Sequence, residues 1–249
     1  EPEVAQVLVE RAAEAGATIL WEGVDFGVEH RVPAVGGQVM SLRGLRGEYD
    51  ELFLPLYGAH QGRNAALALA AVEAFAGDEP LDAELVHEAF AQMTSPGRLE
   101  IIRRSPTIVL DAAHNPHGAK ALAEALEDSF DFNPLVGVVG VMADKDYEGV
   151  LSALEGSFSE IVCTQNTTPR AMPAEELAEA ARGIFGSDRV HVAPRLDDAI
   201  DKAATLAETG GVYGSGGVLV TGSVITVGEA RSMLKPRERE RDRLKSGRI

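Results

Sequence analysis

The sequence predicts an α/β fold whose C-terminal part is a doubly wound, mostly parallel sheet flanked by helices. From about residue 95 onward, short apolar runs alternate with helical patterns. These runs are continuously apolar, which is typical of parallel strands that are buried on both faces. Before residue 95, helical patterns flank segments of alternating polarity, which indicates half-buried strands. We therefore divide the chain into domains at residues 1–94 and 95–249.

Each domain has its own succession of expected elements. The first is expected to hold helices at residues 2–14, 60–77 and 82–93, with strands at 17–23, 36–44 and 49–58. The second is expected to hold strands at 107–113, 135–142, 160–165, 189–194 and 217–223. Helices are expected between and after them, at 115–130, 146–157, 173–186, 196–210 and 227–234.

Composition restricts the classes of protein to consider. The 249 residues are 45% hydrophobic and 25% charged, as in a soluble globular protein. No apolar run reaches the length of a membrane span, and the first residues do not resemble a signal peptide. The single cysteine, Cys163, excludes an intramolecular disulfide and fits a reducing cytosol. We therefore expect a cytoplasmic protein without a membrane partner.

The net charge of −16 argues against a general nucleic-acid binder. Residues 235–249 hold seven Lys or Arg and three acids, so this charged tail carries +4 and the remainder −20. We interpret the tail as a solvated, mixed-charge helix or a disordered end. The alternative is a basic arm for nucleic acid, which the interspersed acids weaken.

Polar residues gather where a parallel sheet binds ligands, at the carboxyl ends of its strands. In "IVLDAAHNPHG", Asp111 ends a strand, where its carboxylate can accept hydrogen bonds from a ligand hydroxyl. Asn115 suits the N-cap of the next helix and Pro116 its first turn, so His114 stands beside an anion-favouring helix N-terminus. Alternatively, Asn115 is only a cap and the histidines are surface residues. Zinc binding by Asp111, His114 and His117 is a less favoured alternative.

Two other motifs precede this strand. In "GAHQGRNA", the spacing puts His60 and Asn64 on one face of a first helical turn, where polar side chains usually face solvent. In "SPGR", Pro96 and Gly97 predict a turn, and Arg98 follows it at the junction of the two domains. An arginine there can clamp a phosphate. A plain surface arginine is the alternative.

Cations and hydroxyls follow the later strands. Lys145 and Arg170 each come after an expected strand, so together they can hold the carboxylates of an acidic substrate. The alternative is ordinary polarity at a helix entry, since Asp144 and Asp146 flank Lys145. In "VTGSVITVGEAR", Ser223 ends the last expected strand and can turn its hydroxyl to the same edge.

Together these motifs resemble one family. The segments "GAHQGRNA", "SPGRLE", "LDAAHNPHG", "VMADKD", "TPRA" and "VTGSVITVGEAR" are similar, in this order, to the C-terminal half of folylpolyglutamate synthases, including bifunctional dihydrofolate synthases. These enzymes belong to the Mur ligase superfamily. The resemblance extends from the start of the chain to about Leu234.

The resemblance implies an ATP-dependent ligase that adds L-glutamate to a folate or dihydropteroate through an acyl phosphate, with Mg²⁺. It implies that Asn64 approaches the adenine, Arg98 the phosphates and Asp111 the ribose. It implies a catalytic role for His114 near the phosphate and acyl-transfer region. It implies that the glutamate subsite holds Ser223, Lys145 and Arg170.

One departure from the family is large. The phosphate loop G-x-x-x-x-G-K-[ST] of the family does not occur in this sequence. We therefore interpret residues 1–94 as the last part of a central ATP-binding domain and 95–249 as the complete Rossmann-like ligase domain. By this interpretation the chain is a monomeric, inactive fragment, and the Mg²⁺ ligands lie in the missing N-terminal part. Two alternatives stay open: another Mur-type amino-acid ligase, which "AHNPHG" disfavours, or a non-catalytic nucleotide-binding module.

Overall fold

The computed structural model describes residues 2–210 and 214–235, which form two compact units. The first unit comprises Glu1–Pro55 and Ala59–Met93, and the second comprises Leu56–Gly58 and Thr94–Ile249. Most of the charged tail, residues 236–249, lies outside the described residues, so its predicted state is not addressed. Among the helices of the described ranges, none is both long and apolar enough to cross a membrane.

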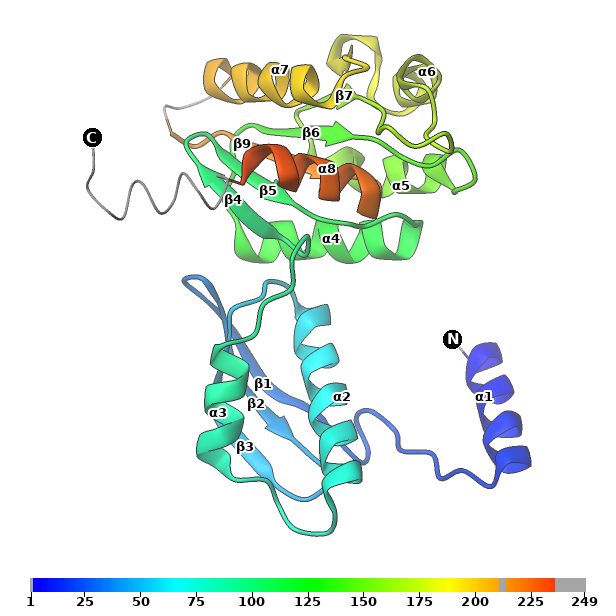
Figure 1. Cartoon of the computed structure of the whole chain (residues 1–249), viewed down its shortest axis with the longest axis vertical. Helices are drawn as coiled ribbons and strands as arrows, with labels where there is room; N and C mark the ends of the chain where they lie inside the picture. The colour runs from blue at the N-terminus through cyan, green and yellow to red at the C-terminus, as the bar shows by residue number, and fades with distance from the viewer. Residues whose placement is uncertain (1, 211–213, 236–249) are drawn as a thin grey trace. The chain divides into compact units, whose positions relative to one another are not determined.

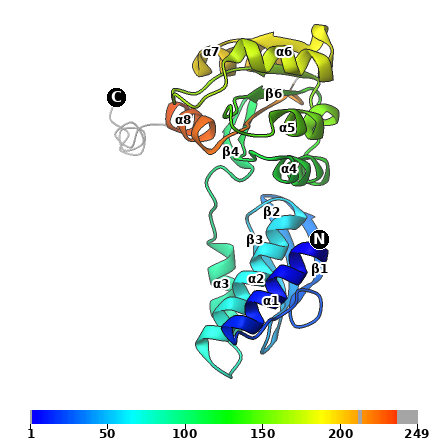
Figure 2. The ribbon, with the colours of Figure 1, turned by 90° about the vertical axis from the view of Figure 1, so that its right-hand side faces the viewer.

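The first unit is a small antiparallel sheet covered by helices. Its strands lie in the order β1-β2-β3, and α2 and α3 lie on the same face of the sheet in both views (Figures 1 and 2). In chain order its elements are α1 (Pro2–Ala15), β1 (Gly27–Ala34), β2 (Gly37–Arg43), β3 (Glu48–Leu54), α2 (Ala59–Ala76) and α3 (Ala83–Ala91).

A buried carboxylate holds this unit together. Glu73 of α2 accepts hydrogen bonds from the backbone N–H groups of Leu45 (2.5 Å) and Arg46 (3.3 Å) in the turn between β2 and β3. The hydroxyl of Tyr49 donates to the same carboxylate at 2.8 Å and accepts from the N–H of Leu81. Burial and the Glu73 bond raise the pKa of Tyr49, so its hydroxyl stays protonated as a donor.

The structure corrects one expected strand and adds another. Residues 17–23, all of them described, form no strand, and their last residues enter a turn in which Asp25 accepts from the N–H of Trp21. The strand of this region is β1, whose charged and glycine-containing sequence gave no apolar pattern. It pairs with β2 through a two-residue turn in which Gly36 has φ +86°.

The second unit is a six-stranded sheet in the order β4-β5-β9-β6-β7-β8. All neighbours pair in parallel except β4 (Glu100–Arg104), an antiparallel edge strand that the sequence analysis did not predict. The expected fold class is confirmed. The other strands are β5 (Thr107–Leu110), β6 (Leu135–Val139), β7 (Glu160–Cys163), β8 (Val190–Val192) and β9 (Gly217–Thr221).

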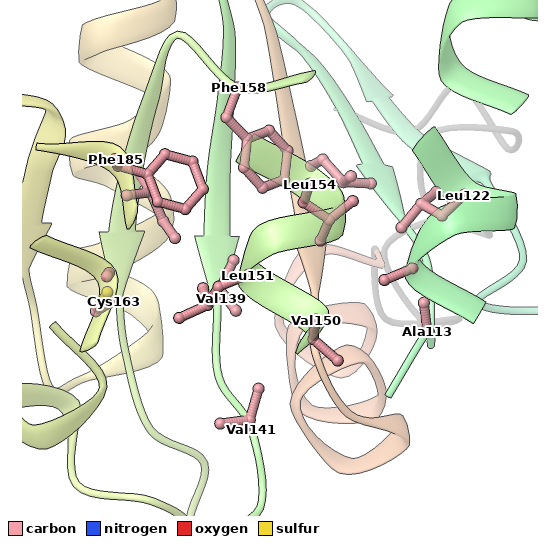
Figure 3. Close-up of a cluster of buried hydrophobic side chains, with 14 of the residues drawn as sticks. Ala113, Leu122, Val139, Val141, Val150, Leu151, Leu154, Phe158, Cys163 and Phe185 are labelled. Carbon is pink, nitrogen blue, oxygen red and sulfur yellow. The ribbon is translucent and has the colours of Figure 1, made fainter. Parts of the chain in front are cut away.

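Helices cover both faces of this sheet (Figure 1). Buried side chains of α4, α5 and α6 pack on one face in a continuous core, which Figure 3 shows around Val139, Leu151 and Phe158. Side chains of α7 and α8 pack on the other face. The helices are α4 (Pro116–Ser129), α5 (Tyr147–Leu154), α6 (Ala174–Phe185), α7 (Leu196–Thr209) and α8 (Val224–Leu234), with 3-10 turns at Glu155–Ser157 and Ser187–Arg189.

The strand order creates a switch point beside β9. This strand lies between β5 and β6, yet α8 leaves it toward the opposite face from α4 and α5, which follow β5 and β6. Connections that leave neighbouring strands toward opposite faces open a crevice at their carboxyl ends. The fold therefore places the candidate site at the ends of β5, β9 and β6.

Candidate functional site at the carboxyl ends of the strands

Backbone hydrogen bonds join the segments that follow these strands. The N–H of Gly222, after β9, donates to the carbonyl of Ala113, after β5, at 3.2 Å. The N–H of Gly140, after β6, donates to the carbonyl of Thr221 at 3.1 Å. Gly222 has φ +102°, and a Cβ there would lie 2.8 Å from the carbonyl oxygen of Gly140. Only glycine therefore fits where these segments approach.

Asp111 lies directly after β5 and is buried, at 5% exposure. Its Oδ1 accepts from the N–H of Ala113 (2.9 Å) and its Oδ2 from the N–H of Leu99 (3.0 Å). Burial raises the pKa of Asp111, while these two donors and the charge of Arg98 oppose the rise. The carboxylate thus anchors the protein's own backbone, and its role as a ribose contact stays a prediction.

The predicted Ser95–Arg98 turn is present and is tied to this anchor. The N–H of Arg98 donates to the carbonyl of Ser95 at 3.1 Å, and Gly97 has φ +71°, as in a type II turn. Leu99 follows at φ +47°, a strained conformation for a leucine, and its N–H is held by Asp111. The side chain of Arg98 is exposed and makes no hydrogen bond to the residues that the structure describes. Its donors remain available for an anion.

His114 is half-buried two residues before α4. Its Nδ1 lies 3.0 Å from the carbonyl of Ala112. Since a carbonyl only accepts, Nδ1 carries the proton, and Nε2 of the neutral ring is left with a lone pair. The N-cap prediction for Asn115 is confirmed, because its Oδ1 accepts from the N–H of Gly118 at 2.7 Å. This cap and Pro116 use up most of the helix terminus, which is therefore a weaker anion site than the sequence suggested.

Ser223 is buried and caps α8. Its Oγ accepts from the N–H groups of Ile225 (3.1 Å) and Thr226 (3.2 Å). In the structure this hydroxyl therefore caps the helix, and the substrate contact implied for it stays a prediction. The hydroxyl of Thr221, the last residue of β9, is fully buried without a hydrogen-bond partner among the described residues.

Two residues that sequence reasoning missed connect three of the segments. Thr226 donates from its hydroxyl to the carbonyl of Gly140 at 2.8 Å and accepts from Nδ2 of Asn166 at 3.0 Å. Asn166, buried after β7, also accepts through Oδ1 from the N–H (3.1 Å) and hydroxyl (3.0 Å) of Thr168. The network fixes the loop that carries Arg170. In the sequence, the only indication of this network is a polar loop, "TQNTTPR", after a buried strand.

Lys145 and Arg170 are brought together by an acid between them. Nη2 of Arg170 lies 2.9 Å from both carboxylate oxygens of Asp144, and Nζ of Lys145 lies 3.4 Å from Oδ2. The Arg170 hydrogen bond, with help from Lys145, lowers the pKa of Asp144. The three side chains form an exposed cluster of two cations and one carboxylate. Asp146, the other acid of the flank, caps α5 by accepting from the N–H of Gly149.

The predicted residues form two groups along the edge. Asp111, His114 and Ser223 follow β5 and β9, while Lys145 and Arg170 follow β6 and β7. Three strand spacings separate β5 from β7, or about 14 Å. Asn64 belongs to the first unit, where it is exposed on α2 and its Nδ2 lies 3.4 Å from Oε1 of Gln61.

The donor atoms at this edge do not assemble a metal site. Both oxygens of Asp111 already bind backbone N–H groups, and the Nδ1 of His114 is directed to a carbonyl. Within residues 2–210 and 214–235, no three His, Cys, Asp or Glu side chains lie close enough to share an ion. The zinc alternative therefore finds no support in these residues.

The fold and this edge define a doubly wound α/β domain with polar residues gathered at its switch point. Residues 97–224 match the family described as Mur ligase, glutamate ligase domain. The chain therefore belongs to the Mur ligase family. That range contains every predicted site residue except Asn64.

Comparison with individual proteins and solved structures agrees with this family assignment. The chain is 48% identical over 243 residues to dihydrofolate synthase/folylpolyglutamate synthase of Mycobacterium tuberculosis, covering 93% of this chain and 50% of that protein. The solved structure of M. tuberculosis folylpolyglutamate synthase complexed with ADP superposes with a TM-score of 0.91 at 49% identity, covering 95% of this chain and 53% of that one. E. coli FolC in complex with DHPP and ADP gives 0.76 at 26% identity, covering 92% and 50%. The chain spans about half the length of the curated relatives it matches.

Proposed function

We propose that this chain supplies the glutamate-ligase part of an ATP-dependent enzyme that adds L-glutamate to a folate. The observation that carries the proposal is the match of residues 97–224 to the glutamate ligase domain, because it covers the polar edge described above. The M. tuberculosis relative is named for both dihydrofolate and folylpolyglutamate synthesis, so dihydropteroate is a second candidate acceptor. We extend the proposal to a monomeric, cytoplasmic enzyme whose partners are ATP, the pterin substrate and glutamate.

The proposed reaction has two steps. A carboxylate oxygen of the folate attacks the γ-phosphorus of ATP, so that ADP leaves and an acyl phosphate forms. The glutamate amine then attacks the carbonyl carbon, phosphate leaves, and the amine proton is lost as the amide forms. The reaction needs groups that bind the phosphate oxygens in both steps and a glutamate amine positioned for attack in the second.

Arg98 and Asp111 are the proposed nucleotide contacts of the second unit. The free donors of Arg98 suit phosphate oxygens, and Asp111 fixes the Leu99 turn that presents them. Each oxygen of Asp111 keeps a lone pair, which suits a ribose hydroxyl. Asn64 is the proposed adenine contact in the first unit. One amide N–H donates to Oε1 of Gln61, which leaves the second N–H and the Oδ1 acceptor for a base edge.

His114 is the proposed catalytic residue. With its Nδ1 proton directed to Ala112, the Nε2 lone pair can take the amine proton, and the imidazolium can bond a phosphate oxygen. The Arg170–Asp144–Lys145 cluster is the proposed site for the glutamate carboxylates, since it has more cations than acids. Ser223 is its proposed neighbour. Mg²⁺ would shield phosphate charge in such a ligase, and among the described residues no cluster of His, Cys, Asp or Glu is placed to hold it.

The test uses a completed ligase, made by joining this chain to the half of the M. tuberculosis relative that it does not match, in the order of that relative. We expect ADP release that depends on both L-glutamate and a folate, with a glutamyl-extended product seen by mass spectrometry. A cell-wall precursor with its amino acid serves as the competing substrate pair. Turnover of that pair alone would replace the folate assignment, and nucleotide binding without turnover of any pair would favour the non-catalytic module.

A further inference from the structure

The turn that carries Arg98 is fixed by more contacts than its own turn hydrogen bond. The carbonyl of Gly97 accepts from the N–H of Ala112 at 2.8 Å. The N–H of Gly97 donates to Oε2 of Glu100, the first residue of β4, at 2.9 Å. Both backbone polar groups of the residue before Arg98 are therefore bonded, one to the segment after β5 and the other to a side chain of β4.

Glu100 is held in turn by α8, from 131 residues further along the chain. Nε of Arg231, in the last turn of α8, donates to Oε1 of Glu100 at 3.0 Å and to Oε2 at 2.8 Å. The two side chains are 30% and 21% exposed, so water screens this ion pair only in part. Helix α8 also lies against the turn itself, because a Cβ on Gly97 would lie 2.9 Å from Cγ1 of Val227.

The backbone conformation that these contacts hold is uncommon. Gly97 has φ +71°, and Leu99 follows it at φ +47°. Strained backbone persists only where its surroundings over-determine it, and it is concentrated at functional sites. Arg98 is the one charged residue in the sequence from 95 to 99, and its exposed side chain makes no hydrogen bond to the described residues. The contacts therefore fix the point from which a single free arginine extends.

We propose that Glu100 and Arg231 are positioning residues for ATP, which act on Arg98 through the backbone of the turn. The inference rests on the proposed function, in which Arg98 binds the phosphates. Glu100 fixes the turn, so less freedom is lost when the arginine binds an anion. Arg231 orients the Glu100 carboxylate, and its charge offsets an acid that would otherwise repel phosphate from a position two residues away.

The test measures the KM for ATP of the completed ligase. Arg98→Ala should raise it about 10- to 150-fold, as expected for loss of a charged phosphate contact. Glu100→Ala removes the bond to Gly97 and should raise it about 3- to 10-fold. Glu100→Gln keeps an acceptor for that N–H and should stay within about twofold of the wild type. The KM for L-glutamate should change little in all three variants.

A double-mutant cycle separates positioning from a purely structural role. Once residue 98 is alanine, Glu100→Ala should change the KM for ATP by less than about twofold, because the residue it acts through is gone. Equal effects with and without Arg98 would overturn the proposal, and so would equal effects of Glu100→Ala and Glu100→Gln. A normal KM in Glu100→Ala beside a raised one in Arg98→Ala would reject the positioning role alone. A normal KM in Arg98→Ala would reject the phosphate contact, and the positioning role with it.

Arg231→Met gives a second measurement, which also carries the test if Glu100→Ala does not fold, because it leaves the turn sequence intact. It should raise the KM for ATP about 2- to 10-fold with little change in the KM for glutamate. Arg182→Met is the matched control, since Arg182 lies in the last turn of α6, is 35% exposed and pairs with Glu179 at 2.8 Å. It should leave both KM values unchanged. The same KM for ATP in Arg231→Met and Arg182→Met would overturn the role of Arg231.

Discussion

At the scale of single residues, one buried carboxylate organises the edge of the second unit. Asp111 was predicted to meet a ligand, and in the structure it accepts hydrogen bonds from the N–H groups of Leu99 and Ala113. These bonds support a left-handed leucine, a conformation that costs on the order of 1–3 kcal/mol. Positioning of Arg98 is thus the role of Asp111 that the geometry supports most directly.

Asp111→Asn should destabilise the chain by about 1–3 kcal/mol, because the new NH₂ group must face one of the two N–H donors.

The raised pKa of Asp111 determines how its contribution to folding stability depends on pH. A carboxyl whose pKa is higher in the folded state than its ordinary 3.8 favours folding most at low pH, and that contribution is lost as pH rises through the folded pKa. Urea titrations should therefore show the wild-type advantage over Asp111→Asn shrinking as pH rises above about 4. An advantage that grows with pH would contradict the raised pKa.

Asp144 shows the opposite shift, and its cause can be removed. Arg170 lowers the pKa of Asp144 below its ordinary value, so Arg170→Ala should raise it, and Lys145→Ala should raise it less. Carboxyl ¹³C NMR on the 249-residue chain measures this directly. If Asp144 titrates alike in the wild type and Arg170→Ala, the two side chains do not form the ion pair in solution.

His114→Ala should slow turnover of the completed ligase by about 10²–10⁴-fold, as expected for a general acid–base residue. The apparent KM for ATP should change much less, because a contact made mainly in the transition state affects kcat first. His117→Ala is the matched control, since His117 is exposed in the first turn of α4. Normal turnover of His114→Ala would remove it from the catalytic group.

At the scale of elements, the sequence predicts helix starts, turns and strands best where the local backbone conformation or burial favours one residue type. Asn115 and Pro116 begin α4 as expected, and the Pro96–Gly97 turn forms because proline and glycine suit its two central positions. The apolar strands of the second unit are all present, since burial on both faces leaves a continuous apolar pattern. Such signals need no knowledge of the partner strand.

The missed elements depend on neighbours that are distant in sequence. β1 and β4 are edge strands with charged residues, so their pairing with β2 and β5 leaves little periodicity to detect. The hydrogen-bond network of the site also joins residues that are distant in sequence, because Asn166 and Thr226 are 60 residues apart. Neither residue type indicates such a pair on its own. The grouping of polar residues at strand ends was predictable from topology, but their hydrogen-bond partners were not.

Thr226→Val tests how far α8 holds this edge together. The substitution keeps the shape but leaves the carbonyl of Gly140 and the amide of Asn166 each without a partner, so it should cost about 1–3 kcal/mol of unfolding free energy. Thr205→Val is the control, because its hydroxyl bonds only the carbonyl of Asp201 on an exposed part of α7. Urea unfolding of both variants makes the comparison. Equal, small losses would show that the network is not a structural link.

At the scale of the whole molecule, the two units have separate cores and different surfaces. The second unit is covered by charged helices and also includes Leu56–Gly58, where the ring of Tyr57 packs on Phe130 with centroids 4.8 Å apart. The first unit exposes large apolar side chains of two helices, namely Val4, Val7 and Leu8 of α1 and Leu67, Val72 and Phe75 of α2. The family match to residues 97–224 lies within the second unit, and the chain covers 50% of the M. tuberculosis relative.

The most direct test of the glutamate assignment is the KM for L-glutamate of the completed ligase carrying Arg170→Ala. Arg195→Ala is the matched control, because Arg195 is also an exposed arginine paired with an aspartate just beyond a strand, in this case Asp197 after β8. Loss of a charged contact of about 1.5–3 kcal/mol predicts that Arg170→Ala raises the glutamate KM roughly 10- to 150-fold, with the KM for ATP little changed. Arg195→Ala should leave both unchanged. A glutamate KM that is the same in Arg170→Ala and in the wild type would contradict the placement of glutamate at the ends of β6 and β7.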